Sequence, residues 1–153
     1  MSWWEDEFLQ VKQNKLYLGN LLAEQLAKRY GTPLYVYSLK KVSANFKKLR
    51  QVFEPPPPGI EVKIAYALKA NSHPAFLKTL FKEGASIDAV SPAEVEKAIK
   101  AGFPQDRIIF TGTSLSQEDF ELILAYPAVT VNIDAFEQID LLEAARKRRR
   151  IKS

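Results

Sequence analysis

One lysine stands where a catalytic amine would be expected. Residues 61–69 alternate between large and small side chains, and the small set ends at Lys69. Because alternate residues of a strand point to opposite faces, the small side chains leave space on the face that carries Lys69. A lysine flanked by Ala67 and Ala70 is expected to be partly desolvated, which lowers the pKa of its amine and favours attack on a carbonyl. From spacing alone, a solvated lysine at a strand end remains the alternative.

Asp88, Glu94 and His73 are the other candidate site residues after Lys69. Asp88 lies on the next expected strand and could share the face of Lys69, and the alternative is a strand-end carboxylate that pairs with a surface lysine. Glu94 stands three residues after Ser91, which is the spacing of a helix capping box, so we expect it to cap a helix rather than to act in catalysis. His73 is the one histidine of the chain, and we expect it at the start of a helix.

Composition argues against several other kinds of site. The 153 residues contain no cysteine and one histidine, so disulfides and cysteine-ligated zinc are excluded and a histidine-rich metal site is hard to build. No glycine-rich phosphate motif follows an expected strand. No apolar run approaches the ~18 residues of a membrane span, and the acidic, aromatic first residues do not resemble a signal peptide. We therefore expect a cytoplasmic protein that binds neither metal nor membrane.

The net charge of +4 originates at one end of the chain. Six of the 22 basic residues lie between positions 146 and 152, and residues 1–145 carry 16 basic and 18 acidic side chains. A terminal basic run can bind nucleic acid. Here it continues a helical pattern and has no aromatic residues within it, so we expect a solvated helix end and no nucleic-acid binding, with a nucleic-acid patch as the alternative.

The segments that would position Lys69 alternate between strand and helix. We expect strands at 61–69, 86–90, 107–111 and 129–133, and helices at 74–83, 92–101, 117–125 and 135–148. Before them we expect an irregular start, strands at 15–18 and 34–37, and helices at 21–30 and 39–53. The helix over 39–53 is expected to be capped by Ser38 and to bury one apolar face. Strands that alternate with helices predict parallel βαβ units.

Two parallel architectures fit this alternation, an open doubly wound sheet and a barrel. The missing nucleotide-binding motif counts against the first. The small side chains of 61–69 suit a barrel interior, and in such barrels the carboxyl ends of the strands carry the active site, where Lys69 stands. About four barrel strands are expected, whereas a complete (β/α)8 barrel has eight strands and ~250 residues.

Five segments carry a family resemblance, in a fixed order. They are residues 30–38 (YGTPLYVYS), 66–72 (YALKANS), 87–94 (IDAVSPAE), 108–112 (IIFTG) and 131–134 (VNID). Together they resemble the fold-type III pyridoxal-phosphate decarboxylases, and the diaminopimelate decarboxylases among them. The resemblance covers about residues 15–150. It departs from the family at Pro92 and Ala93, where many members have two glycines.

The resemblance implies a fold, a cofactor and a reaction. It implies an α/β protein in which residues 39–153 form the N-terminal half of a partial (β/α)8 TIM barrel of the alanine racemase-like class, and residues 1–38 contribute to the family's second, β domain. Lys69 would be linked covalently to pyridoxal 5′-phosphate, with Ala67 and Asp88 beside the cofactor. The reaction would be the decarboxylation of meso-diaminopimelate to L-lysine and CO₂, and the family is homodimeric.

The family's glycine-rich phosphate loop and its substrate-binding arginine have no counterpart in this chain. We therefore expect an N-terminal portion of such an enzyme, from a shortened or split reading frame or an expressed fragment. It would be inactive alone, or would need a complementing C-terminal half. The alternatives are a relative that decarboxylates ornithine or arginine, an amino-acid racemase, and a non-catalytic fragment that binds and regulates a full-length homologue.

Overall fold

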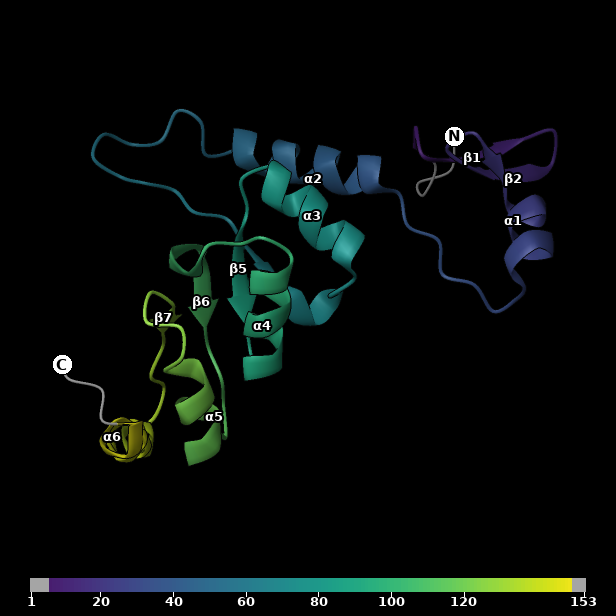
Figure 1. Ribbon diagram of the computed structural model, residues 1–153. Coiled ribbons are helices and arrows are strands. Elements are labelled where there is room, and N and C mark those ends of the chain that lie inside the picture. Colours follow the sequence, from purple (N-terminus) through teal and green to yellow (C-terminus); the bar gives the residue numbers. More distant parts are fainter. Residues whose placement is uncertain (1–5, 150–153) are drawn as a thin grey trace. The chain divides into compact units, whose positions relative to one another are not determined.

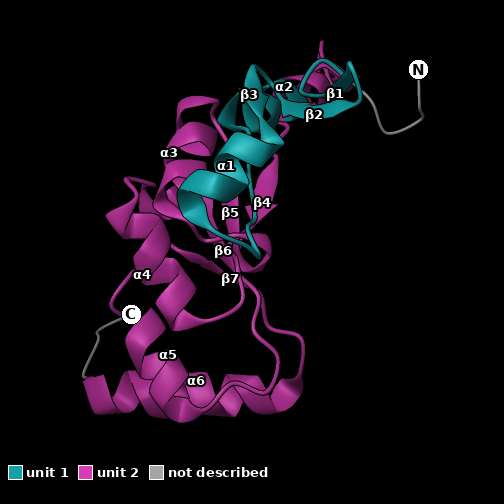
Figure 2. Ribbon diagram, turned by 90° about the vertical axis from the view of Figure 1, so that its right-hand side faces the viewer, with its two compact units in different colours: residues 1–45 teal, residues 46–153 magenta. Residues whose placement is uncertain are grey.

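The computed structural model describes residues 6–149 of the chain (Figure 1). The chain divides into two compact units between Asn45 and Phe46, and the units are coloured separately in Figure 2. The first unit is a small antiparallel sheet with helices, and the second contains the parallel sheet whose first strand leads to Lys69. The assignment of residues 1–38 to a second, β domain stays a prediction.

The first unit begins with a hairpin. Its elements are β1 (Leu9–Lys12), β2 (Lys15–Leu18), β3 (Leu21–Leu22) and α1 (Ala23–Tyr30), with the strands in the order β1-β2-β3. Gln13 and Asn14 form the turn with φ of 51° and 57°, the left-handed pair that matches hairpin twist. The strand expected at 15–18 is confirmed. The expectation of an irregular start is wrong at 9–12, because β1 is formed by pairing with β2.

A strand expected at residues 34–37 does not form. Among residues 6–149 the strands belong to two sheets, β1–β3 and β4–β7, and neither includes Leu34–Tyr37. The β-branched and aromatic residues of this segment favour a strand, but a strand also needs a partner for its backbone groups. Tyr35 is 85% exposed.

Helix α2 (Leu39–Gln51) follows that segment and crosses the boundary between the units. The hydroxyl of Ser38 accepts a hydrogen bond from the Lys41 N–H at 3.2 Å, which confirms the expected cap. Lys41 also donates to Asp6 at 2.6 Å, and this bond is the main cause of the lowered pKa of the Asp6 carboxyl. The expectation of a buried apolar face is wrong for α2, because Phe46 is its one buried residue.

The second unit contains four parallel strands in sequential order. They are β4 (Ala65–Ala67), β5 (Ser86–Ala89), β6 (Ile108–Phe110) and β7 (Thr130–Val131). The helices between and after them are α3 (Pro74–Lys82), α4 (Pro92–Lys100), α5 (Gln117–Ile123) and α6 (Phe136–Arg149), and two 3₁₀ turns are η1 (Leu68–Ala70) and η2 (Gln105–Arg107). This confirms the α/β class. The order β4-β5-β6-β7 is that of a barrel, since a doubly wound sheet reverses its order at a switch point.

Strand β4 is shorter than the strand expected over 61–69. It is paired on one edge, with β5, and the chain turns into η1 at Leu68. Residues 61–63 lie before the ladder and have no place in it. The alternation of side chains was therefore a sound guide to the faces of the sheet and a poor guide to the length of the strand.

The two faces of the parallel sheet differ in burial. On one face Ile87, Ala89, Ile108 and Phe110 are completely buried, and Tyr66 and Val131, on the outer strands, are half-buried. On the other face the side chains are exposed or half-buried, and they include Ala65, Ala67, Asp88, Ile109 and Thr130, with buried Ser86 as the exception. We call them the covered face and the open face. The carboxyl ends of β4 to β6 lead into the turns that bear the expected site.

Side-chain caps fix where the helices begin. The Ser91 hydroxyl accepts from the Glu94 N–H at 3.3 Å, and the Glu94 carboxylate accepts from the Val90 N–H at 2.8 Å. The expected helix-capping function of Glu94 is confirmed, although the reciprocal bond reaches Val90 instead of Ser91. A complete capping box, which the sequence analysis missed, joins Ser116 and Asp119 at the start of α5.

Candidate functional site

A hollow of about 460 Å³ lies at the carboxyl ends of β4, β5 and β6. Its lining residues are Lys69, Asp88, Val90, Thr111 and Thr113, and we call it the Lys69 hollow. The structure thus brings Lys69 and Asp88 to one place. Ala67 is not part of this lining, but it is the ladder partner of Asp88 and lies on the same open face.

Lys69 is placed by the turn that ends β4. Leu68, which is fully buried, anchors η1, and the next residue, Lys69, is exposed. The following loop is held by the Tyr66 hydroxyl, which donates to the Asn71 carbonyl at 3.2 Å. The expected partial desolvation of Lys69 is not observed, because Lys69 and its neighbour Ala70 are both exposed.

Asp88 is half-buried on the open face of β5. Its neighbours in the ladder are Ala67 on β4 and Ile109 on β6. Within residues 6–149, the ion pairs between side chains do not include Asp88. The alternative of a carboxylate paired with a surface lysine is therefore not observed, and the carboxylate lines the same hollow as the Lys69 amine.

Thr111 and Thr113, the lining residues that follow β6, were not predicted from the sequence. The ladder continues past β6, where the Thr111 N–H donates to the Ala89 carbonyl at 2.9 Å. The Thr111 hydroxyl accepts from the Asn132 side chain at 2.8 Å. Between the two lining threonines stands Gly112, where a Cβ would overlap the Leu115 side chain. The sequence feature that could have indicated these lining residues is a glycine between two threonines directly after an expected strand.

His73 begins a helix, as expected. Its Nδ1 accepts from the Ala75 N–H at 3.2 Å, which makes His73 the cap of α3. The backbone N–H of His73 donates to the Asn71 side chain at 2.9 Å. The imidazole is therefore used in fixing the turn that follows Lys69, and it is not among the residues that line the Lys69 hollow.

Comparison with known proteins identifies the family. Residues 39–152 match the model of the pyridoxal-dependent decarboxylases, pyridoxal binding domain. The chain belongs to this family. It is 37% identical over 134 residues to the diaminopimelate decarboxylase of Bacillus subtilis, covering 88% of this chain and 30% of that one. Over 124 residues it is 37% identical to the diaminopimelate decarboxylase of Methanothermobacter thermautotrophicus, covering 81% and 28%.

Solved structures agree with this assignment. The structure of AQ1208 from Aquifex aeolicus is similar with a TM-score of 0.84 and 28% identity, covering 97% of this chain and 36% of that one. A diaminopimelate decarboxylase from Helicobacter pylori, complexed with L-lysine, is similar with a TM-score of 0.73 and 31% identity, covering 85% and 32%. The chain thus spans about 30% of the length of these pyridoxal-dependent decarboxylases.

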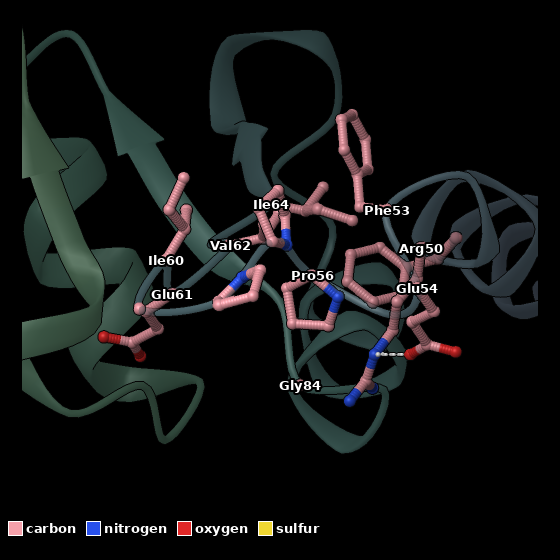
Figure 3. A pocket seen from close by; sticks show the side chains of 13 residues that line it. Arg50, Phe53, Glu54, Pro56, Ile60, Glu61, Val62, Ile64 and Gly84 are labelled. Carbon is pink, nitrogen blue, oxygen red and sulfur yellow. Dashed lines mark ion pairs between the residues drawn. The ribbon is translucent and has the colours of Figure 1, made fainter.

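A larger hollow of about 750 Å³, drawn in Figure 3, shares no lining residue with the Lys69 hollow. It is lined by the end of α2, the proline-rich segment 55–59 and the residues that precede β4. Its lining is mostly apolar, and its charged groups include Arg50 and Glu54, whose side chains pair at 3.1 Å. It borders the amino end of β4, and in parallel barrels the chemistry is found at the opposite end.

The basic run lies at the end of α6, as expected. Arg148 pairs with the Glu121 carboxylate at 3.3 Å, and Arg149 donates to the Glu121 carbonyl. Arg150 and Lys152 lie outside the described residues. Across 6–149, no helix is both long and apolar enough to cross a membrane, and no three acidic or histidine side chains are grouped so as to hold a metal ion.

Proposed function

We propose that this chain supplies the cofactor lysine of a pyridoxal-phosphate decarboxylase that converts meso-diaminopimelate to L-lysine and CO₂. The observation that carries the proposal is the Lys69 hollow, which a lysine and an aspartate both line at the carboxyl ends of parallel strands. The hollow lies within the residues that match the pyridoxal binding domain. Named relatives with 37% identity are diaminopimelate decarboxylases.

The side chains of the hollow fit pyridoxal phosphate. Its aldehyde requires a primary amine, which Lys69 provides, and its ring nitrogen is commonly partnered by an acidic or basic side chain, for which Asp88 is available. Ala67, beside Asp88 on the open face, is small enough to leave room for a flat ring. When bound, the cofactor supplies the electron sink that makes the loss of a carboxylate possible.

Each residue then has a stated part in the reaction. The Lys69 Nζ is the nucleophile that binds the cofactor, and among the residues that line the hollow it is the one basic nitrogen, so we assign to it proton transfer to the substrate carbon. The Asp88 carboxylate attracts cationic groups toward the same end of the hollow. The Thr111 hydroxyl, whose oxygen accepts from Asn132, retains its hydrogen for an acceptor in the hollow.

We further propose that the active enzyme is a cytoplasmic homodimer and includes more polypeptide than this chain. The chain spans about 30% of its named relatives. Within residues 6–149 the parallel sheet has four strands, with β4 and β7 at its two edges, whereas a barrel requires eight strands. A complementing portion would pair with both edges and cover the open face, which would remove Lys69 from bulk water.

Covalent labelling tests the cofactor assignment. The purified chain is incubated with pyridoxal phosphate, reduced with borohydride and mapped by mass spectrometry. We expect Lys69 to carry most of the label and Lys69→Ala to lose it. Lys97→Ala removes an exposed lysine whose Nζ donates to Ser72 at 3.0 Å, and should leave the Lys69 label unchanged. Label spread evenly over the lysines of the chain would overturn the assignment.

Competition tests the substrate. Once unbound pyridoxal phosphate has been removed, the loaded chain receives either meso-diaminopimelate or L-ornithine before reduction. Both amines compete with Lys69 for the aldehyde and so lower the Lys69 label. We expect meso-diaminopimelate, as the proposed substrate, to do so at lower concentration than L-ornithine. The reverse order would favour an ornithine decarboxylase. Release of CO₂ by this chain alone, abolished in Lys69→Ala, would contradict the need for further polypeptide.

A further inference from the structure

Gln138 is a buried polar side chain on the inner side of α6. It is 5% exposed, and Ser86 is the other buried polar residue among positions 6–149. Its Nε2 donates to the Gly112 carbonyl at 3.1 Å, and its Oε1 accepts from the Asp134 N–H at 3.2 Å. One amide therefore joins the loop after β6 to the loop after β7.

Both partners of Gln138 are backbone groups, so the direction of each bond is fixed. A carbonyl can only accept and an N–H can only donate, so the bridging side chain needs a donor and an acceptor at once. The spacing of Asp134 and Glu137 predicts a capping box, but the Asp134 N–H is bound by Gln138 instead. A glutamate at 138 could serve the Asp134 N–H and would leave the Gly112 carbonyl without a donor.

The same cap geometry is found two strands away, without the second bond. Glu94 accepts from the N–H of Val90, four residues earlier, as Gln138 accepts from the N–H of Asp134. Capping at this spacing is thus achieved by a carboxylate. The amide at 138 adds a donor, and that donor is directed at Gly112.

Gly112 is the residue between the two threonines of the Lys69 hollow. Thr111 and Thr113 both line the hollow, and Gly112 is buried between them. The loop has little room to change its path, because a side chain at Gly112 would overlap Leu115 and because Ser114 has a φ of 55°. Holding the Gly112 carbonyl therefore fixes the direction of the peptide plane that joins Gly112 to Thr113.

We propose that Gln138 is a positioning residue of the Lys69 hollow. Its amide holds the Gly112 carbonyl so that Thr111 and Thr113 present their polar groups to a ligand bound at Lys69, an inference that rests on the proposed function. Gln138 itself does not line the hollow. It acts through Gly112, and its effect is on how readily Lys69 is labelled by pyridoxal phosphate.

Three variants separate positioning from capping. Gln138→Glu keeps the acceptor for Asp134 and loses the donor for Gly112, whereas Gln138→Leu loses both. Gln105→Leu is the matched control, because the Gln105 side chain accepts from the Ala128 N–H at 3.1 Å and so joins the segments before β6 and β7, at the other end of the same strands. Circular dichroism of each variant confirms that it is folded.

Three measurements are made on each variant. Hydrogen exchange at Asp134 and the amide NMR signal of Thr113 report on the two bonds of residue 138, with no cofactor present. We expect Gln138→Glu to shift the Thr113 signal and keep Asp134 exchange within about twofold of wild type, and Gln138→Leu to change both. Lys69 labelling by pyridoxal phosphate should fall at least threefold in both variants and stay at the wild-type level in Gln105→Leu.

The outcomes distinguish the two proposals. An unchanged Thr113 signal in Gln138→Glu would overturn the Gly112 contact. A shifted signal with undiminished Lys69 labelling would overturn the positioning role. If the wild-type chain is not labelled at Lys69, the proposed function fails and the positioning role fails with it, whereas the amide signals still decide whether Gln138 holds Gly112.

Discussion

The covered face and the open face of the parallel sheet are made by the same strands and differ in almost every other respect. On β5 and β6 the residues Ile87, Ala89, Ile108 and Phe110 have no exposed surface. Their neighbours Asp88 and Ile109, one position along, are only half-buried. Because alternate residues of a strand point to opposite faces, the four-residue strand β5 places Ile87 and Ala89 in the core and Asp88 on the face that leads to the candidate site.

This difference shows which substitutions should alter stability and which should alter function. The covered face supplies the apolar burial that holds β5 and β6 to the helices. The open face carries Asp88 and leads to Lys69, and it contributes little to packing because its side chains remain in contact with solvent. Whether a strand residue serves stability or the candidate site can therefore be inferred from the face to which it points, and substitutions test the inference.

The largest effect is expected on the covered face. Phe110→Ala should destabilise the chain by about 3–5 kcal/mol, because a fully buried aromatic ring is replaced by a cavity. Ile109→Ala, its neighbour on the open face, should cost only about 1–2 kcal/mol. Denaturant unfolding monitored by circular dichroism measures both. Equal losses in the two variants would contradict the division of the sheet into two faces.

A smaller effect is expected where a covering helix begins. Ser116→Ala removes one half of the capping box of α5 and should cost about 1 kcal/mol. Ser116→Thr keeps a hydroxyl and should retain most of that stability. Thermal unfolding measures the two variants. Because Ser116 does not line the Lys69 hollow, Lys69 labelling of the folded chain should be unchanged. A loss of labelling without a loss of stability would contradict the separation between residues that stabilise the fold and residues that form the hollow.

The smallest effect on stability is expected on the open face. Asp88→Asn should change the free energy of unfolding by no more than about 0.5 kcal/mol, since the side chain is half-buried and forms no ion pair within the described residues. Labelling of Lys69 by pyridoxal phosphate should nevertheless fall severalfold, because the carboxylate charge is lost. Asp106→Asn, an exposed aspartate in η2, is the control. A drop in stability without a drop in labelling would reverse our assignment of Asp88.

Local signals allowed much of this fold to be predicted. A few neighbouring residues were enough to predict the cap at Ser38 and the helix start at His73. They were also enough to predict the faces of the sheet to which Leu68 and Asp88 point. The failures involve partners that are distant in the sequence. Leu34–Tyr37 has strand-forming residues but belongs to neither sheet of the described residues, and β4 (Ala65–Ala67) is shorter than the alternating pattern over 61–69 indicates. Pairing cannot be read from one segment.

The candidate site was predictable in part for the same reason. Lys69 was singled out because of its own strand and its motif, and Asp88 because its parity matched. Thr111 and Thr113 were missed because their place beside Lys69 depends on the path of a loop. Gln138 could not have been found from its surroundings in the sequence, since its contact with Gly112 spans 26 residues and its neighbour Glu137 had the spacing expected of the cap.

The contact between Gln138 and Gly112 also sets an order of events during synthesis. A chain made from its amino end releases Lys69, Asp88 and Gly112 from the ribosome before Gln138 emerges. Until α6 has docked, the loop after β6 lacks the bond that fixes its carbonyl. The nascent chain therefore exposes Lys69 before the loop after β6 is held, and α6 is the helix whose docking supplies the bond from Gln138 to Gly112.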